Sequence, residues 1–514
     1  MLILNNEQTK KLEDNAVNDG GIEHIKLMEN AGTSVFRFIN ECMGVNNKSV
    51  AIVCGRGNNG GDGFAVAKRM LEGGAKVRIL LALGNPTTDD AGRLLEESEA
   101  MGIKTFLYAD DKERVEFSKT IDAADIIVDA IFGVGFHGTV SETLTEIISM
   151  INNARGTVVS IDVPSGVDSD SGEVAGPCVR ADYTVTFSTM KPGHVIYPAV
   201  DYCGHVHIAT IGIDDRVIQE QEHHISTIDY QSVRLCFRPR KNNTHKGTYG
   251  RLLNICGSVG MAGSATFAGK AAVQSGAGMV EMAVARDIYP IVAANLIDPV
   301  YILLDSNVQG TIAASSIPTV LEKMQNATAV MIGCGLGKGE DVQQLVAEVI
   351  RNSEVPMVID ADGLNAIKDN LGVLREAKAP IIMTPHPGEM ARLVGKTNEE
   401  VQSQRLEVAS SFAMTYGIYL VLKGANTVCA TPDGRIMINL TGNPGMSKSG
   451  SGDVLAGLMG SLLAQGMSAE DAAASAVHIH GLAGDRAAEK FSQHSMSPMD
   501  IIFEFADIFA EIER

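Results

Sequence analysis

The chain lacks tryptophan altogether, and aromatic residues make up only 5% of it. Proteins that bind single-stranded nucleic acids stack the bases on aromatic side chains, so this composition argues against that partner. Positive charge is also scarce: 42 Lys and Arg residues stand against 62 Asp and Glu residues, which gives a formal charge of −20. Such a chain is repelled by a polyphosphate backbone and by an anionic membrane surface. We therefore expect neither nucleic acid nor a membrane as a partner.

Two further absences concern the cellular compartment of the protein. No segment approaches the roughly 20 consecutive apolar residues of a membrane span, and the N-terminus, MLILNNEQTKK, has neither a basic leader nor a long apolar core. The eight cysteines contain no CxxC pair, which favours buried thiols over a disulfide or zinc framework. These features predict a cytoplasmic protein in a reducing compartment.

The chain is long and contains many glycines. It has 514 residues, of which 45% are hydrophobic and 53 are glycine. At roughly 100 to 200 residues per domain, the length predicts two large domains. Two helices are expected between residues 5 and 43. After them, short apolar runs alternate with helix-length amphipathic stretches, as in βαβ units with a mainly parallel sheet. The predicted strands are 50–54, 77–83, 126–131 and 158–163, followed by 252–256, 279–284, 329–332, 357–359, 381–383 and 419–422.

A polar stretch at 214–243 interrupts this alternation, and it includes an unbroken polar run at 219–224. Both halves have their own strands, helices and glycine-rich turns. We therefore predict an α/β protein with one domain over 1–220 and a second over 221–514.

Three polar loops follow predicted strands of the first half. The segment 55–63, GRGNNGGDG, opens a helix, so its amides can approach a phosphate, although a plain tight turn is the alternative. The segment 133–139, GVGFHGT, follows the strand that ends near Asp129. In IDVPSG, Asp162 is placed for general acid/base chemistry or simply caps a turn. Asn59, Asp129 and Ser165 could converge as hard oxygen donors for a cation.

A dehydrogenase of the usual kind would carry an acidic residue at the end of its second strand to hold the ribose. The run at 77–83 leads instead into Gly84, Asn85 and Pro86. We therefore do not expect an ordinary NAD oxidoreductase.

The second half has comparable loops. The segment 441–453, TGNPGMSKSGSGD, precedes an apolar helix, so its last amides form an anion site beside Asp453. That carboxylate is suited to take a proton from a hydroxyl attacking a phosphoryl group, unless it only caps the helix. The turn LKGANT offers Lys423 to nucleotide phosphates. In TPHPGE, His386 is rigidly presented, and Glu389 either orders a divalent ion through water or starts a helix.

Other polar features receive a simpler interpretation. The turns at 333–337 and 360–364 should line the same sheet edge. The pairs His205/His207 and His478/His480 have no neighbouring ligands, and we interpret both as structural.

Taken together, GRGNNGGDG, GVGFHGT, DVPSG, TPHPGE, KGANT and NPGMSKSGSGDVLAG resemble, in this order, the motifs of the bifunctional NAD(P)H-hydrate repair enzymes. The resemblance spans nearly the whole chain. It implies an NAD(P)HX epimerase domain of Rossmann-like fold with a helical hairpin, followed by an NAD(P)HX dehydratase domain of ribokinase-like fold. The substrates would be NADHX and NADPHX, nicotinamide nucleotides hydrated at ring carbon 6. The nicotinamide nucleotide is then repaired and not used as a hydride carrier, in agreement with the missing ribose acid.

The resemblance also implies the residues of the epimerase site. Asp162 would be the acid/base group, and Asn59, Asp129 and Ser165 would bind a potassium ion. The residues that would hold the hydrate are Asn58, Asn59, Gly60, Gly61, Asp62, Gly133, Val134, Gly135, Phe136, His137, Gly138, Thr139 and Asp162.

In the dehydratase, Asp453 would be catalytic. The hydrate would contact Ala262, Gly335, His386 and Asp453, and the nucleotide would contact Lys423, Gly424, Ala425, Asn426, Thr427 and Gly452. Phosphorylation would turn the hydroxyl of the hydrate into a good leaving group, which the electron pair of the ring nitrogen can expel, while Mg²⁺ offsets charge. The two-domain chain looks bacterial or archaeal, which implies ADP as the phosphoryl donor.

Two other classes of protein stay open. A ribokinase-type small-molecule kinase with an N-terminal nucleotide-binding module would release a stable phosphorylated product. A noncatalytic nucleotide sensor would bind at both sites without turnover. In each case the partners are small molecules, and we expect a homo-oligomer.

Overall fold

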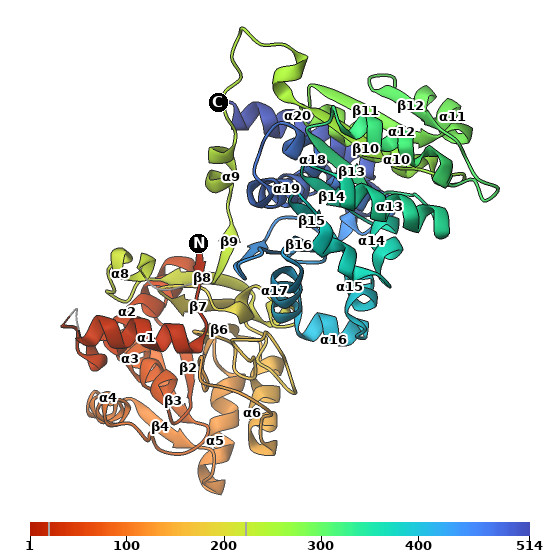
Figure 1. The fold of residues 1–514 in the computed structure, drawn as a ribbon. Helices are drawn as coiled ribbons and strands as arrows, with labels where there is room; N and C mark the ends of the chain where they lie inside the picture. Colours follow the sequence, from red (N-terminus) through yellow and green to blue (C-terminus); the bar gives the residue numbers. More distant parts are fainter. Residues whose placement is uncertain (19–20, 221–223) are drawn as a thin grey trace. The chain divides into compact units, whose positions relative to one another are not determined.

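The computed structural model describes residues 1–18, 21–220 and 224–514 (Figure 1). The chain divides into two compact units, Met1–His223 and His224–Arg514. The predicted junction at 220/221 adjoins residues 221–223, which lie outside the described residues. The assignment of one enzyme activity to each side of that junction stays a prediction.

A parallel sheet forms the centre of the first unit, with the strand order β4-β3-β2-β5-β6-β7-β8. From β2 the chain continues to β3 and β4 on one side, and from β5 it continues to the other side. This places a topological switch point between β2 and β5, where open α/β sheets bind ligands beyond the carboxyl ends of the strands. The strands are β4 (Lys104–Leu107), β3 (Lys76–Leu81), β2 (Ser49–Cys54), β5 (Ile126–Ala130), β6 (Thr157–Ile161), β7 (Tyr183–Phe187) and β8 (His205–Ala209).

Helices cover both faces of this sheet (Figure 1). Because side chains alternate along a strand, Ile52 of β2 belongs to the core on one face and Val53 to the core on the other. Strands buried on both faces are apolar throughout, which explains why the sequence predicts them. The first core includes helices α2 (His24–Met43), α3 (Asn58–Glu72) and α4 (Asp89–Ala100), and the second includes α5 (Asp111–Asp122) and α6 (Glu142–Asn153). The two helices expected between residues 5 and 43 are α1 (Asn6–Asn18) and α2.

The sheet of the second unit is mixed, with the order β9-β18-β17-β16-β15-β14-β13-β10-β11-β12. Neighbours from β12 to β16 are parallel, β17 is antiparallel to both its neighbours, and β9 is parallel to β18. The mainly parallel prediction is confirmed. The strands are β9 (Ile225–Ile228), β10 (Arg251–Ile255), β11 (Met279–Ala285), β12 (Val300–Leu304), β13 (Ala329–Ile332), β14 (Met357–Ile359), β15 (Ile381–Met383), β16 (Tyr419–Leu422), β17 (Val428–Ala430) and β18 (Ile436–Asn439).

One helix of this unit lies very close to its neighbour. A Cβ on Gly457 of α18 would lie 2.1 Å from the carbonyl oxygen of Ala268 on α10. This approach holds the first turn of α18 beside the carboxyl ends of the strands. The helices on this face are α10 (Ala262–Gln274), α18 (Ser451–Ala464), α19 (Ala469–Ser495) and α20 (Pro498–Ile512), and Figure 1 shows α13 (Glu340–Asn352) and α14 (Asp362–Ile367) on the other. None of the described helices is both long and apolar enough to cross a membrane.

Candidate active sites

The first candidate site begins where β2 ends. A Cβ on Gly55 would lie 2.0 Å from the carbonyl oxygen of Ile131, and a Cβ on Gly60 would lie 2.2 Å from the carbonyl oxygen of Gly55. Only glycine allows these approaches, so α3 starts directly against the ends of β2 and β5. The predicted hydrate residues 58–62 form the first turn of α3 at this edge of the sheet.

Asp162 follows β6 and is 7% exposed. Its Oδ1 accepts hydrogen bonds from the Lys191 ammonium at 2.8 Å and from the Thr186 hydroxyl at 3.0 Å. Its Oδ2 accepts one from the N–H of Val134 at 3.1 Å. Burial opposes ionisation, but Lys191, with smaller contributions from His194 and Thr186, outweighs it and lowers the pKa of Asp162 below its usual value. Asp162 is therefore an ionised carboxylate whose Oδ2 faces the 133–139 loop.

The backbone of Asp162 is strained, because its φ of +66° lies in the left-handed region. His194 stabilises this conformation: its Nε2 donates to the carbonyl oxygen of Asp162 at 2.8 Å. The Nδ1 of the same ring accepts the N–H of Lys191 at 3.0 Å, which fixes the tautomer. Burial and Lys191 lower the pKa of His194 to about 4, so the ring is neutral. Strain held in this way is typical of functional residues.

Two further carboxyl groups belong to this charge network, Asp62 on α3 and Glu13 on α1. Burial, together with the charges of Glu13 and Asp162, raises the pKa of Asp62 well above its usual value. Burial also raises the pKa of Glu13, with Lys191 opposing the rise. One site thus combines a carboxyl group whose pKa is lowered with two whose pKa values are raised, and such divergent pairs are typical of acid/base sites.

Two of the three predicted potassium ligands are in contact. Asp129, at the end of β5, is fully buried, and the Ser165 hydroxyl donates to its Oδ1 at 2.6 Å. The Ser165 N–H donates to Oδ2 at 2.9 Å, as does the Ser160 hydroxyl at 2.8 Å. Burial raises the pKa of Asp129 in spite of these bonds. The Nδ2 of Asn59 is buried without a hydrogen-bond partner among the described residues.

The 133–139 loop is close to Asp162 at its start and exposed at its end. A Cβ on Gly133 would lie 3.2 Å from Oδ2 of Asp162 and 3.3 Å from Oδ1 of Asn59, so the structure brings these three predicted residues together. Phe136 stacks on Phe132 with ring centroids 4.6 Å apart. The exposed members of the loop are Gly135, His137, Gly138 and Thr139.

Sequence reasoning missed Lys191, Thr186 and His194, which surround Asp162. Lys191 is 1% exposed, and its ammonium also donates to the Thr186 hydroxyl at 2.8 Å and to the carbonyl oxygen of Phe187 at 3.2 Å. A signal was present: the polar run Lys191-Pro-Gly-His194 follows the apolar strand β7. The predicted strands did not include β7, so no polar strand end was expected there.

The second candidate site is centred on an ion pair. The Lys423 ammonium donates to Oδ1 of Asp360 at 2.7 Å, and the Thr384 hydroxyl donates to the same oxygen at 2.7 Å. Burial opposes protonation of Lys423, but Asp360 and Glu389 outweigh it and raise its pKa. A Cβ on Gly452 would lie 3.3 Å from Nζ of Lys423. The ends of β14, β15 and β16 and the start of α18 therefore meet here.

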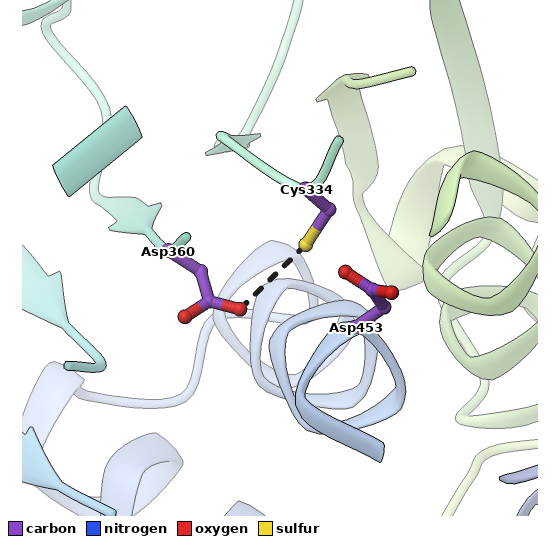
Figure 2. A group of neighbouring side chains, drawn as sticks. All are labelled: Cys334, Asp360 and Asp453. Carbon is purple, nitrogen blue, oxygen red and sulfur yellow. Dashed lines mark hydrogen bonds between the residues drawn. The ribbon is translucent and has the colours of Figure 1, made fainter. Parts of the chain in front are cut away.

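Asp453 lies in the first turn of α18, next to this ion pair. Burial, followed by the charge of Asp360, raises the pKa of Asp453 to about 6, although Cys334, Ser264 and Lys423 limit the rise. The Sγ of Cys334 donates to Oδ2 of Asp360 at 3.7 Å. Figure 2 shows this thiol between the two carboxylates, and the sulfur and one carboxylate oxygen of each aspartate lie within 4.8 Å of one another. Asp453 is thus a carboxylate that titrates near neutrality.

Two predicted hydrate contacts adjoin Asp453. Gly335 has φ +64°, and a Cβ there would lie 2.8 Å from Cβ of Ser264. Ser264 belongs to the first turn of α10, which Ala262 begins, and it hydrogen-bonds Asp453. The structure therefore brings Ala262, Gly335 and Asp453 into one neighbourhood. Sequence reasoning missed Ser264 and Cys334 there.

His386 and Glu389 form a capping box at the start of α15 (Pro387–Val394). The Nδ1 of His386 accepts the N–H of Gly388 at 3.1 Å, and Oε2 of Glu389 accepts the N–H of His386 at 2.9 Å. Glu389 therefore starts a helix, which was one of the two readings, and its carboxylate is 8% exposed. The His386 side chain is 52% exposed, so a ligand can reach the ring from solvent, and its Nε2 lies 3.4 Å from Oε1 of Glu389.

Comparisons with known proteins agree with this geometry. Residues 252–506 match the family model described as NAD(P)H-hydrate dehydratase, and residues 24–193 match the model of the YjeF-related protein N-terminus. The chain is 39% identical, over 94% of its own length and 91% of the relative's, to the bifunctional NAD(P)H-hydrate repair enzyme Nnr of Moorella thermoacetica. The chain belongs to the family of bifunctional NAD(P)H-hydrate repair enzymes. It is an NAD(P)HX epimerase and an NAD(P)HX dehydratase in one polypeptide.

A solved structure shows the same fold for the second unit. A ribokinase-like superfamily protein of Enterococcus faecalis superposes with a TM-score of 0.50 at 22% identity, covering 57% of this chain and 98% of that one. The ADP/ATP-dependent NAD(P)H-hydrate dehydratase of Bacillus subtilis, which was co-crystallised with ATP and Mg²⁺, gives 0.49 at 29% identity, covering 56% of this chain and 99% of that one. The predicted Rossmann-like and ribokinase-like folds are confirmed.

Proposed function

We propose that the repair reactions take place at the two strand-end sites, with Asp162 as the acid/base group of the epimerase and Asp453 as the base of the dehydratase. The observation that carries the proposal is the pair of opposite electrostatic environments. Lys191 holds Asp162 ionised, whereas burial and Asp360 raise the pKa of Asp453 to about 6. We also propose that 1–220 carries the first activity and 221–514 the second.

For epimerisation, the hydrate would lie between residues 58–62 and 133–139, with its C6 hydroxyl at Oδ2 of Asp162. Asp162 accepts the hydroxyl proton as the C6–N1 bond opens to an aldehyde, and the electron pair of that bond goes to N1, which is then protonated. Rotation about C5–C6 and closure on the other face give the second epimer. Lys191 stabilises the carboxylate in the step in which it carries charge.

The residues predicted to hold potassium fit that ion in chemical type. Asp129, Ser165 and Asn59 supply the hard oxygen donors that it prefers. The orphaned Nδ2 of Asn59 supports this, because turning the amide over would place an oxygen in the same position. When bound, the ion would supply positive charge beside the hydrate.

For dehydration, residues 423–427 and Gly452 would hold the nucleotide, and Ala262, Gly335, His386 and Asp453 would hold the hydrate. Asp453 accepts the proton of the C6 hydroxyl as its oxygen bonds to the phosphoryl group, and AMP leaves if ADP is the donor. The electron pair of N1 then expels phosphate from C6, and loss of the C5 proton completes the reduced nicotinamide. We propose ADP as the donor. The carboxylate of Asp360 is an oxygen donor suited to Mg²⁺, which would offset phosphoryl charge.

One assay tests the proposal as a whole. The protein is mixed with Mg²⁺, NADHX and either ADP or ATP, and the return of reduced-nicotinamide absorbance is followed. We expect full recovery of both epimers, faster with ADP. A stable phosphorylated product would instead indicate a small-molecule kinase, and binding without turnover would indicate a sensor. Light scattering during size-exclusion chromatography tests the expected homo-oligomer.

A further inference from the structure

A buried guanidinium lies behind the loop proposed to bind the nucleotide. Arg405 begins α17 (Arg405–Tyr416) and is 5% exposed. Its Nη2 donates to the carbonyl oxygens of Leu422 at 3.1 Å and Lys423 at 3.4 Å. Its Nη1 donates to Oε1 of Gln402 at 2.7 Å. Arg405 therefore contacts the main chain where β16 ends and the 423–427 loop begins.

This cation has no anionic partner among the described residues. No carboxylate of the described chain lies within ion-pair distance of it, and its buried Nε has no hydrogen-bond partner there. Burial lowers the pKa of Arg405 to about 10, and no neighbouring charge opposes the shift. Because an unpaired buried cation is costly to a fold, the hydrogen bonds that Arg405 donates to the main chain are the contacts that offset this cost.

The hydrogen bonds of Arg405 set the direction of one peptide group. A carbonyl and the N–H of the same planar peptide point in opposite directions. Since the Lys423 carbonyl is held toward the guanidinium, the N–H of Gly424 points away from it, and this N–H donates to no atom of the described chain. Gly424 has φ +143°, and a Cβ there would lie 2.9 Å from Nη1 of Arg405. The loop is therefore packed directly on the guanidinium.

We propose that Arg405 is a positioning residue for the nucleotide. Its guanidinium fixes the peptide between Lys423 and Gly424 so that the Gly424 N–H donates to a phosphate oxygen of the nucleoside diphosphate. A carbonyl that accepts from a cation polarises its peptide, which makes the N–H on the other side a stronger donor. This inference rests on the proposed assignment of residues 423–427 to the nucleotide.

The test compares the affinities of the full chain for ADP and for adenosine by calorimetric titration. Arg405→Lys keeps the charge but loses the planar fork that reaches the main chain. We expect its Kd for ADP to rise about 10-fold or more, because a charge-assisted contact is lost, while its Kd for adenosine stays within about 2-fold. In turnover, KM for ADP should rise while KM for the hydrate and the epimerase rate stay unchanged.

Two other variants keep the test decisive. Gln402 is exposed, so Gln402→Ala should fold, and loss of its contact with Nη1 should raise the Kd for ADP about 2- to 5-fold. If Arg405→Lys does not fold, an unchanged Kd in Gln402→Ala overturns the proposal. Arg351→Lys is the matched control, since Arg351 of the same unit pairs with Glu348 and Glu376 at the surface and should leave ADP binding unchanged.

The outcomes separate this inference from the proposed function. An ADP affinity within 2-fold of wild type in Arg405→Lys, or an equal loss for adenosine, overturns the role of Arg405. Lys423→Ala examines the loop itself. If Lys423→Ala binds ADP normally, the assignment of the loop to the nucleotide is wrong. If it weakens ADP while Arg405→Lys does not, only the role of Arg405 is wrong.

Discussion

Asp162 and Asp453 carry the same chemical group, but their surroundings shift its pKa in opposite directions. The Lys191 ammonium, 2.8 Å from Asp162, keeps that carboxylate charged in a buried position. Asp453 has no such direct partner, and the nearby Asp360 carboxylate makes its ionisation harder. A substitution at each position therefore has its own signature.

Asp162→Asn should lower epimerisation by roughly 10²- to 10⁴-fold, the range of a positioned acid/base group. Asparagine keeps the shape and tolerates the left-handed backbone, but it leaves the buried Lys191 ammonium without its carboxylate, so a melting curve of the variant accompanies the rate measurement. Dehydration of the correct epimer is the internal control and should stay near the wild-type rate. Chromatography of the two epimers gives the rate, and unchanged interconversion would remove Asp162 from the mechanism.

Asp453→Asn should lower dehydratase turnover by roughly 10²- to 10⁴-fold, which corresponds to about 3 to 5 kcal/mol in the barrier. ADP binding should persist, because the amides at the start of α18 and the Lys423 loop are unchanged. Titration with ADP and a turnover assay on one preparation give both numbers. Turnover within a factor of a few of wild type would mean that Asp453 is only a helix cap, and loss of ADP binding would mean that its role is architectural.

The raised pKa of Asp453 also predicts a pH dependence of rate and of stability. Below pH 6 the base is protonated, so dehydratase turnover should fall about tenfold per pH unit. Because its folded pKa lies above the usual value of 3.8, Asp453 favours folding at low pH, and this contribution is lost as the pH rises from about 4 to about 6. Asp453→Asn should therefore stabilise the dehydratase unit at pH 7.5, by roughly 1 to 3 kcal/mol, and leave it unchanged at pH 4. A melting temperature that is lower at both pH values would contradict this reading.

At the scale of residues, the sequence predicts the carboxylates that the chemistry requires. It does not predict the neighbouring residues that set their pKa values. Asp162 and Asp453 could be named because a carboxylate at a strand end or a helix start is suited to acid/base chemistry, with a turn cap and a helix cap as the alternatives. Lys191 lies 29 positions from Asp162, and only the pairing of β6 with β7 brings the two together. Such long-range pairings depend on tertiary packing, which no local pattern encodes.

At the scale of elements, the close packing of α18 on α10 holds the first turn of the dehydratase site. Gly457→Ala should destabilise the second unit by roughly 1 to 3 kcal/mol, because the new methyl would overlap the Ala268 carbonyl oxygen. Gly263→Ala on α10 is the matched control, since a Cβ there meets nothing within 4 Å. That control should be neutral or slightly stabilising through helix propensity. Thermal unfolding of both variants decides the comparison, and equal melting temperatures would show that the helices can move apart.

The strand predictions agree best with the structure where a strand is buried on both faces and is therefore a continuous apolar run, as in β2 and β13. The short hairpin strands β17 and β18 were missed, as were β4, β7, β9 and β12. β17 has three residues and β18 has four, but length alone does not explain the miss, because β14 and β15, also of three residues, were predicted. These two strands matter for function, because β17 closes the loop that begins at Lys423.

At the scale of the whole molecule, each unit has its own sheet and its own buried cores. A fragment of residues 1–220 should therefore fold and epimerise the hydrate by itself, and a fragment of residues 224–514 should dehydrate the correct epimer. Circular dichroism and the two activity assays check this. An insoluble or inert first fragment, with an epimerising full chain, would show that the boundary or the independence of the domain is wrong.

The presence of two self-contained units in one polypeptide fixes their ratio in the cell. Every ribosome that completes the chain releases one epimerase and one dehydratase, so no change in gene expression can alter their proportion. The share of damaged nucleotide in the configuration that the dehydratase does not accept then depends on the relative turnover rates of the two sites, and not on separate control of their amounts. Natural selection on this balance must act on the sites themselves and not on promoters.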